Sequence, residues 1–195
     1  MNNLKTEIAE IKKVVESKKI LTYPPLTKSE INEFCEKHDV DLPEEYVLFL
    51  TEVGDGWKRT QNDVFSTINM NRLSESFNSA EDLRKEFPFV NGWVWEDGGG
   101  EEWPQLDGES DDEYEERLIA LEESALNGQI TLIDVGGGGS WNLIISGKCK
   151  GQIWFVCGEG AIPCTDRLTF FGWIRKWLDG VKEIGDYLYV PDSDN

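Results

Sequence analysis

Apolar residues near the start of the chain recur at helical spacing. Residues 4–15 carry one apolar stripe, made of Leu4, Ile8, Ile11 and Val15. The stripe predicts an amphipathic helix that packs on the domain or on a partner. We expect residues 1–22 to form this N-terminal helical segment.

Two further helices are predicted before residue 54. Thr27 stands three residues before Glu30, the spacing of a capping box, which predicts a helix over 27–38. Pro43, followed by two acidic residues, suits the first turn of a second helix over 44–53, because proline needs no N–H there and acids favour the positive end of the helix dipole.

The middle of the chain is less periodic. Val64 to Met70 has strand character, and Ser79 to Phe87 predicts a short helix. Glycines and acids fill 96–113, which predicts a loop. Tyr114 to Leu126 predicts a helix with one apolar side, made of Leu118, Leu121 and Ala125.

Three short runs rich in β-branched residues follow. Ile130–Ile133, Trp141–Ile145 and Ile153–Val156 predict strands, and the glycine-rich segments between them are short enough for an antiparallel meander. Asp166 is placed to cap a closing helix that carries apolar residues from Phe170 onward. Because the strands cluster apart from the helices, we expect an α+β fold, a small antiparallel sheet flanked by helices in a single domain.

The charge narrows the classes of partner. The chain has 195 residues and a formal net charge of −19, which disfavours nucleic acid and anionic membrane surfaces and favours one basic protein partner.

The N-terminus lacks the continuous apolar stretch of a signal peptide, and no apolar run reaches the length of a bilayer span. We therefore expect a cytoplasmic protein.

Residues suited to catalysis or metal binding are sparse. The four cysteines form no close-spaced pair and His38 is the only histidine, so we expect reduced thiols, no metal and no cofactor. His38 follows a helical pattern and is expected to have a capping or surface role. Gly136–Gly139 is followed by Ser140-Trp141 and strand-like residues, so it predicts a strand connection with positive φ angles rather than a phosphate-binding loop.

Acidic residues are concentrated between Glu96 and Glu123, where thirteen carboxylates face one arginine. Pairs of acids arise there without design, so they do not indicate a hydrolase. A charge run of this kind is typical of a solvated face, but interleaved aromatic residues also suit a lysine- and arginine-rich partner. The candidate partner-binding residues are Trp95, Glu96, Asp97, Glu101, Glu102, Trp103, Asp107, Asp111, Asp112, Glu113 and Glu116.

Several segments resemble the SUKH superfamily, most closely its Smi/Knr branch. They are LTKSEINEFCE (26–36), DLPEEYVLFL (41–50), GDG (54–56), GSWNLII (139–145), GQIWF (151–155) and FFGWI (170–174). The resemblance covers roughly 23–60 and 128–180, so we expect a SUKH-like domain over 23–185, with an acidic insertion around 61–127 and an acidic tail at 186–195.

The resemblance implies that the protein acts by binding other proteins and does not catalyse a reaction. Bacterial members of the superfamily are mostly immunity proteins that neutralise polymorphic toxins, many of them nucleases, and fungal members include regulators of cell-wall synthesis. We therefore expect a non-enzymatic immunity protein that occludes a basic toxin domain. The alternative is a regulatory scaffold that binds several protein partners.

Overall fold

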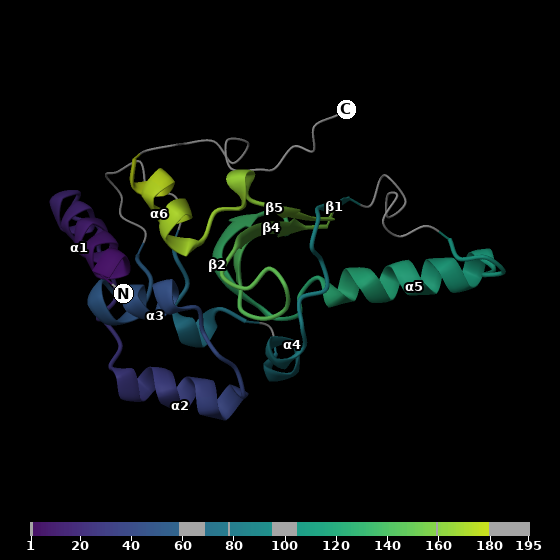
Figure 1. Cartoon of the computed structure of the whole chain (residues 1–195), viewed down its shortest axis with the longest axis horizontal. Helices are drawn as coiled ribbons and strands as arrows, with labels where there is room; N and C mark the ends of the chain where they lie inside the picture. The colour runs from purple at the N-terminus through teal and green to yellow at the C-terminus, as the bar shows by residue number, and fades with distance from the viewer. Residues whose placement is uncertain (1, 59–68, 78, 95–104, 159, 180–195) are drawn as a thin grey trace.

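The computed structural model describes residues 2–58, 69–77, 79–94, 105–158 and 160–179. Figure 1 shows a small sheet with most helices on one side. The helices are α1 (Asn2–Ser17), α2 (Lys28–His38), α3 (Glu44–Glu52), α4 (Ala80–Arg84), α5 (Asp111–Ser124) and α6 (Phe170–Leu178), with short 3-10 turns η1 (Leu73–Glu75) and η3 (Thr165–Arg167). The α+β architecture is as predicted.

Five antiparallel strands form one sheet in the order β1-β5-β4-β3-β2. They are β1 (Trp93–Val94), β2 (Gln129–Gly136), β3 (Gly139–Ile144), β4 (Ile153–Cys157) and β5 (Gly160–Pro163). The predicted meander is confirmed, since β2 pairs with β3 and β3 with β4. β1 and β5 were not predicted.

The β2–β3 connection is a tight glycine hairpin. Gly137 and Gly138 are its two central residues, with φ angles of 64° and 83°. Positive φ at both positions matches the right-handed twist of the flanking strands. The expected strand connection at Gly136–Gly139 is therefore confirmed.

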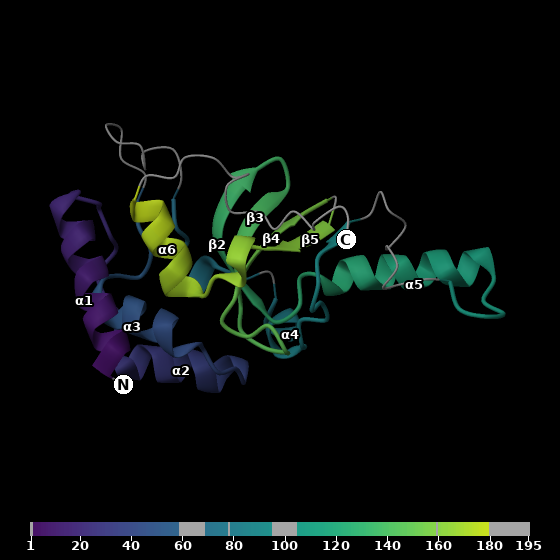
Figure 2. The ribbon, with the colours of Figure 1, turned by 45° about the horizontal axis from the view of Figure 1, so that its top comes forward.

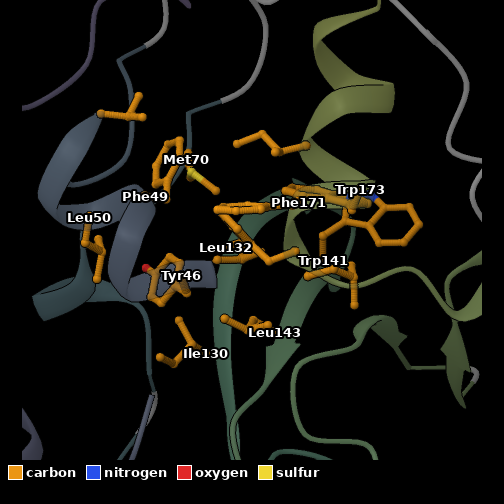
Figure 3. Packing of buried hydrophobic residues seen from close by; sticks show 14 of the residues in the cluster. Tyr46, Phe49, Leu50, Met70, Ile130, Leu132, Trp141, Leu143, Phe171 and Trp173 are labelled. Atoms are coloured by element: carbon orange, nitrogen blue, oxygen red, sulfur yellow. The ribbon is translucent and has the colours of Figure 1, made fainter. Parts of the chain in front are cut away.

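One face of the sheet packs against α3 and α6, and α1 packs on these two helices from outside. Figure 3 shows Tyr46 of α3 and Phe171 and Trp173 of α6 on the side of β2 and β3 residues such as Leu132 and Trp141. The Trp141 and Trp173 rings lie 6.2 Å apart between centroids. Burying so many large side chains is the main favourable contribution to this half of the fold.

α1 belongs to this core. Ile8, Ile11 and Val15 are buried, so the predicted stripe packs on the domain. At its exposed side, Arg175 of α6 donates to Glu10 at 2.7 Å.

The opposite face of the sheet is covered by a second apolar cluster. Trp154 and Val156 of β4 point to this face, and Phe87, Phe89 and Trp93 pack over them. The Phe87 and Trp154 rings meet edge to face at 4.9 Å. Alternate residues of β4 therefore serve two cores, which requires cover on both faces.

The capping box at α2 is confirmed, with Glu30 N–H donating to Thr27 Oγ1 at 3.2 Å and Thr27 N–H to Glu30 Oε2 at 2.7 Å. α3 also begins where predicted. The expected helix at Ser79–Phe87 is confined to α4, capped by Ser79. The predicted strand at Val64–Met70 lies largely outside the described residues; Met70 forms a β-bridge with Trp57.

Two sequence predictions in the last half were wrong. Asp166 does not cap the closing helix, because it lies within η3 at φ 61° and α6 begins after Thr169. The predicted loop over 96–113 is helical from Asp111 onward, since Ser110 and Glu113 form a capping box that starts α5 earlier.

A buried carboxylate fastens the GDG bend to the segment before η1. Asp55 is 2% exposed and accepts from the Leu73 N–H at 2.8 Å and from Arg72 Nε at 3.1 Å. Gly56 has a φ of 80°, and a Cβ there would lie 2.5 Å from the Met70 carbonyl oxygen. The bend and residues 70–73 are therefore closely fitted to each other.

Replacing Asp55 with alanine should destabilise the protein markedly. The buried Leu73 N–H would lose its acceptor, at a cost of about 1–3 kcal/mol. Urea denaturation measures the change in the free energy of unfolding. Asp41→Ala is the matched control, because this exposed carboxylate pairs with Lys150 at the surface and contributes about 0–1 kcal/mol. Equal losses in both variants would contradict the role given to Asp55.

Candidate partner-binding surface

Helix α5 touches the sheet only near its C-terminal end. Leu121 and Ala125 are buried in the second cluster with Leu118 partly buried beside them, whereas the first turn is exposed. Figures 1 and 2 both show the helix extending away from the sheet, on the side opposite α1, α3 and α6. Its N-terminal half is thus presented to solvent.

We call residues 105–117 the acidic arm. It carries one arginine, Arg117, against seven acidic residues, which are Asp107, Glu109, Asp111, Asp112, Glu113, Glu115 and Glu116. Three of these acids occupy the first turn of α5, where the helix dipole favours negative charge. Charge of this density is therefore compatible with a regular helix.

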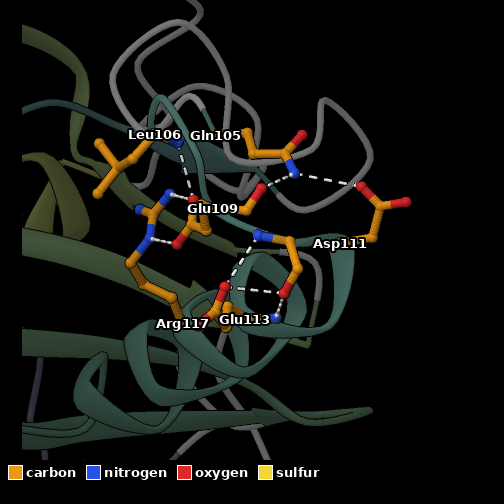
Figure 4. A network of polar contacts seen from close by, with 7 residues as sticks. Gln105, Leu106, Glu109, Asp111, Glu113 and Arg117 are labelled. Carbon is orange, nitrogen blue, oxygen red and sulfur yellow. Dashed lines mark hydrogen bonds and ion pairs between the residues drawn. The ribbon is translucent and has the colours of Figure 1, made fainter.

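The start of α5 within the arm is fixed by the Ser110–Glu113 capping box, shown in Figure 4. Ser110 N–H and Oγ–H donate to Glu113 Oε2 at 2.9 and 2.8 Å, and Glu113 N–H donates to Ser110 Oγ at 3.4 Å. The backbone donor and the hydroxyl of Ser110 lower the pKa of Glu113. Glu113 therefore serves as a structural cap as well as a surface charge.

Arg117 binds Glu109 with two hydrogen bonds. Its Nε donates to Glu109 Oε1 at 2.7 Å and its Nη2 to Oε2 at 2.9 Å. Leu106 N–H adds a third donor at 2.8 Å, and the guanidinium lies 5.2 Å from the centre of the Tyr114 ring. The Arg117 hydrogen bonds, followed by the Leu106 N–H, lower the pKa of Glu109 to about 2.

This pair folds the preceding loop onto the helix. Gln105 Nε2 donates to the Glu109 carbonyl oxygen at 2.9 Å and to Asp111 Oδ1 at 3.2 Å. The sequence shows Arg117 as the single opposing charge but does not reveal that it pairs eight residues back with Glu109. By contrast, the carboxylates of Asp112, Glu115 and Glu116 form no hydrogen bond or ion pair within the described part of the chain.

The predicted site residues divide into two groups. Five lie together on the exposed acidic arm: Asp107, Asp111, Asp112, Glu113 and Glu116. The other six lie outside the described residues: Trp95, Glu96, Asp97, Glu101, Glu102 and Trp103. Their role in binding stays a prediction for both groups.

Two tryptophans in loop-like sequence are not surface anchors. Trp57 is 2% and Trp93 is 3% exposed, and each belongs to an apolar cluster. Trp57 packs edge to face on Phe49, and Trp93 stacks on Phe89 at 5.5 Å. The residues around them show no helical or strand periodicity that would have predicted burial in a core.

His38 is buried, so of the two expected roles, capping or surface, the surface role was wrong. It ends α2 with its ring 4.6 Å from Phe34 and 4.9 Å from Phe77, because the turn packs against the segment after η1. Burial, with lesser contributions from Lys37 and Arg84, lowers its pKa. Cys149 and Cys164 are buried and Cys35 and Cys157 half-buried, all four free, and no metal-binding cluster occurs among the residues described.

Comparison with known protein families gives one match. The model of the SMI1 / KNR4 family (SUKH-1) matches residues 25–170, which is well over half of the chain. A small α+β domain of this type is what the structure shows, and the chain belongs to the SMI1 / KNR4 family (SUKH-1). A search of curated proteins found no match.

Family membership fits a role in toxin immunity and implies binding to a toxin protein, and members of the family are generally immunity proteins rather than enzymes. Within the described ranges, no helix has the length and apolar character needed to cross a membrane. The match runs from before α2 to the start of α6 and so includes the acidic arm.

Replacing Arg117 with glutamine should raise the pKa of Glu109 from about 2 toward its ordinary value of 4.5. The main cause of the lowered value is then gone, while the Leu106 N–H remains. Carboxyl ¹³C NMR titration measures this pKa. Glu113 is the internal control, because its lowered pKa depends on Ser110 and should persist. An unchanged Glu109 titration would show that Arg117 does not hold this carboxylate.

Acidification should destabilise the protein through His38. Because its pKa in the folded chain is lowered below the ordinary 6.5, the unfolded chain takes up the proton first. The contribution is fully present above pH 6.5 and is lost as pH falls from there toward the folded pKa. Between pH 7.5 and pH 5, the free energy of unfolding measured by denaturation should fall more for the wild type than for His38→Phe. If the free energies of unfolding of the two proteins fall in parallel over this pH range, the role given to His38 is contradicted.

Proposed function

We propose that this chain is a cytoplasmic immunity protein that binds one cognate toxin domain and occludes its active surface. Membership of the SUKH-1 family supports the class of function. The observation that carries the proposed binding mode is the exposed acidic arm, which continues into the part of α5 that Leu121 and Ala125 anchor to the sheet. We assign the arm as the main contact surface.

The charge of the arm indicates the chemistry of the toxin. A nuclease must hold a polyanionic substrate, so its active surface carries lysine and arginine side chains. An acidic helix competes for that surface and accelerates encounter through long-range attraction. We therefore propose a basic, nuclease-type toxin domain as the partner.

The geometry of the arm lowers the loss of conformational entropy that binding a partner would require. The capping box and the Glu109–Arg117 pair hold the loop and the first turns of α5 in one arrangement before any partner arrives. Preorganised groups lose less conformational entropy on association. Four exposed carboxylates of the described arm remain for contact with a partner: Asp107, Asp112, Glu115 and Glu116.

We infer further that the protein inhibits by binding and catalyses no reaction. His38 lies between two phenylalanine rings rather than beside a nucleophile, and the Gly136–Gly139 segment is a hairpin rather than an anion-binding loop. These contacts support a binding role. A nuclease or protease assay on the purified chain at high concentration tests this inference, and turnover that survives repurification would refute it.

Charge reversal on the arm should slow association with the toxin. The test variant is Asp112→Lys/Glu115→Lys/Glu116→Lys, and the partner is the cognate toxin domain, which is to be sought in the neighbouring genes. We expect the association rate to fall by about tenfold or more at low salt. The wild-type rate should also fall between 0.1 and 1 M salt, where the Debye length shrinks from about 10 Å to about 3 Å.

The matched control is Glu16→Lys/Glu33→Lys/Glu36→Lys, which makes the same change of charge at exposed positions of α1 and α2. Both variants should fold normally, because exposed charges contribute about 0–1 kcal/mol each. Equal slowing by the two variants would mean that only net charge matters and that the arm is not the contact surface. Capture of several unrelated proteins in place of one toxin would favour the regulatory-scaffold alternative.

A further inference from the structure

A pocket of about 410 Å³ opens where the C-terminal end of α5 meets the sheet. It lies on the face opposite α1, α3 and α6, between α5, the β2–β3 hairpin and the β4–β5 turn. Its lining residues come from these separate segments of the chain, and they differ from the residues of the acidic arm.

The inner lining of the pocket is apolar and partly built from backbone. Leu126 is 42% exposed there, and the mostly buried side chains of Val156 and Ala125 lie beside it. Gly138 and Gly158 line the pocket without side chains, and a Cβ added at either would meet nothing within 4 Å. A side chain from another protein can therefore enter against an apolar surface without displacing protein atoms.

Two carboxylates, those of Glu122 and Glu123, also line the pocket. Both residues are exposed, and neither carboxylate has a hydrogen bond or ion pair within the described part of the chain. Lys85 is the basic group that interacts electrostatically with Glu123, but its ammonium is bound to Glu81 at 3.0 Å. Among the described residues, no basic side chain is therefore dedicated to neutralising the negative charge at the pocket.

We propose that this pocket receives one lysine or arginine side chain of the protein partner, an inference that rests on the proposed immunity function. The aliphatic stem would lie along Leu126 and Val156, and the cationic head would reach Glu122 and Glu123. Long cationic side chains combine an apolar stem with a charged end in this way. The pocket would anchor the partner at one end of α5, and the acidic arm would contact it at the other.

The pocket can be tested without the toxin. The probes are N-acetyl-lysine-N-methylamide, the corresponding arginine derivative, and the norleucine derivative, which has an uncharged aliphatic side chain. Each is titrated into the full-length ¹⁵N-labelled protein. The backbone amides of Leu126, Gly138, Ser140 and Gly160 report binding, because these residues line the pocket.

We expect both cationic probes to shift these amides saturably at millimolar concentration, and norleucine to bind more weakly. Glu122→Gln/Glu123→Gln should weaken the cationic probes by about fivefold or more, since charge-assisted contacts are lost. Glu115→Gln/Glu116→Gln, with the same change of charge on the arm, should leave probe binding unchanged. Absence of saturable shifts, equal binding of norleucine, or equal weakening by both double variants would overturn the proposal.

The two proposals fail in different ways. If no cationic probe binds, the proposal for the pocket is rejected, while the proposal that the acidic arm binds a toxin stands. If the protein binds the cationic probes but not the toxin domain, the pocket is retained as a site for cationic side chains and the toxin is rejected as the partner. Alkylation of Cys157 gives a second readout, because this half-buried thiol lines the pocket and should react more slowly when a cationic probe fills it.

Discussion

The sheet is apolar on both faces, and the arrangement of the other elements follows from that constraint. Trp141 on β3 and Trp154 on β4 are neighbouring, fully buried side chains that point to opposite faces. Helices α3 and α6 bury the first face, and α1 packs on these two helices. The second face is covered by residues 87–93 and by only the last turns of α5. The incomplete reach of α5 leaves its first half to project into solvent.

Helix α5 therefore joins folding and function in one element. Leu121 and Ala125 hold its C-terminal end in the second cluster, and the Glu109–Arg117 pair orders its N-terminal end. Between these anchors the helix presents unpaired carboxylates, and beside its buried end it borders the pocket lined by Glu122 and Glu123. In the proposed function, recognition relies mainly on the charged face of this helix, and the same negative charge opposes self-association of the free protein.

Much of the fold was predictable where local signals are strong. The capping box at Thr27, the glycine hairpin and the β-branched runs each specify local backbone geometry, and all were confirmed. β1 and β5 were missed because strands of two and four residues contain too few positions for a period. The cap expected at Asp166 failed because that residue lies in the 3-10 turn η3 with a left-handed φ of 61°, and α6 begins only after Thr169.

The candidate site was harder to predict. Composition pointed to the acidic segment, but charge alone does not say which carboxylates are already engaged, and the pairing of Glu109 with Arg117 depends on how the loop folds back. The pocket was not predicted, since its lining comes from segments distant in sequence. Hydrogen–deuterium exchange of the purified complex with the cognate toxin domain tests the central claim most directly. The account predicts slower exchange across residues 111–117 of α5 with α2 unchanged; protection confined to α1 and α2, with α5 exchanging as in the free protein, would contradict it.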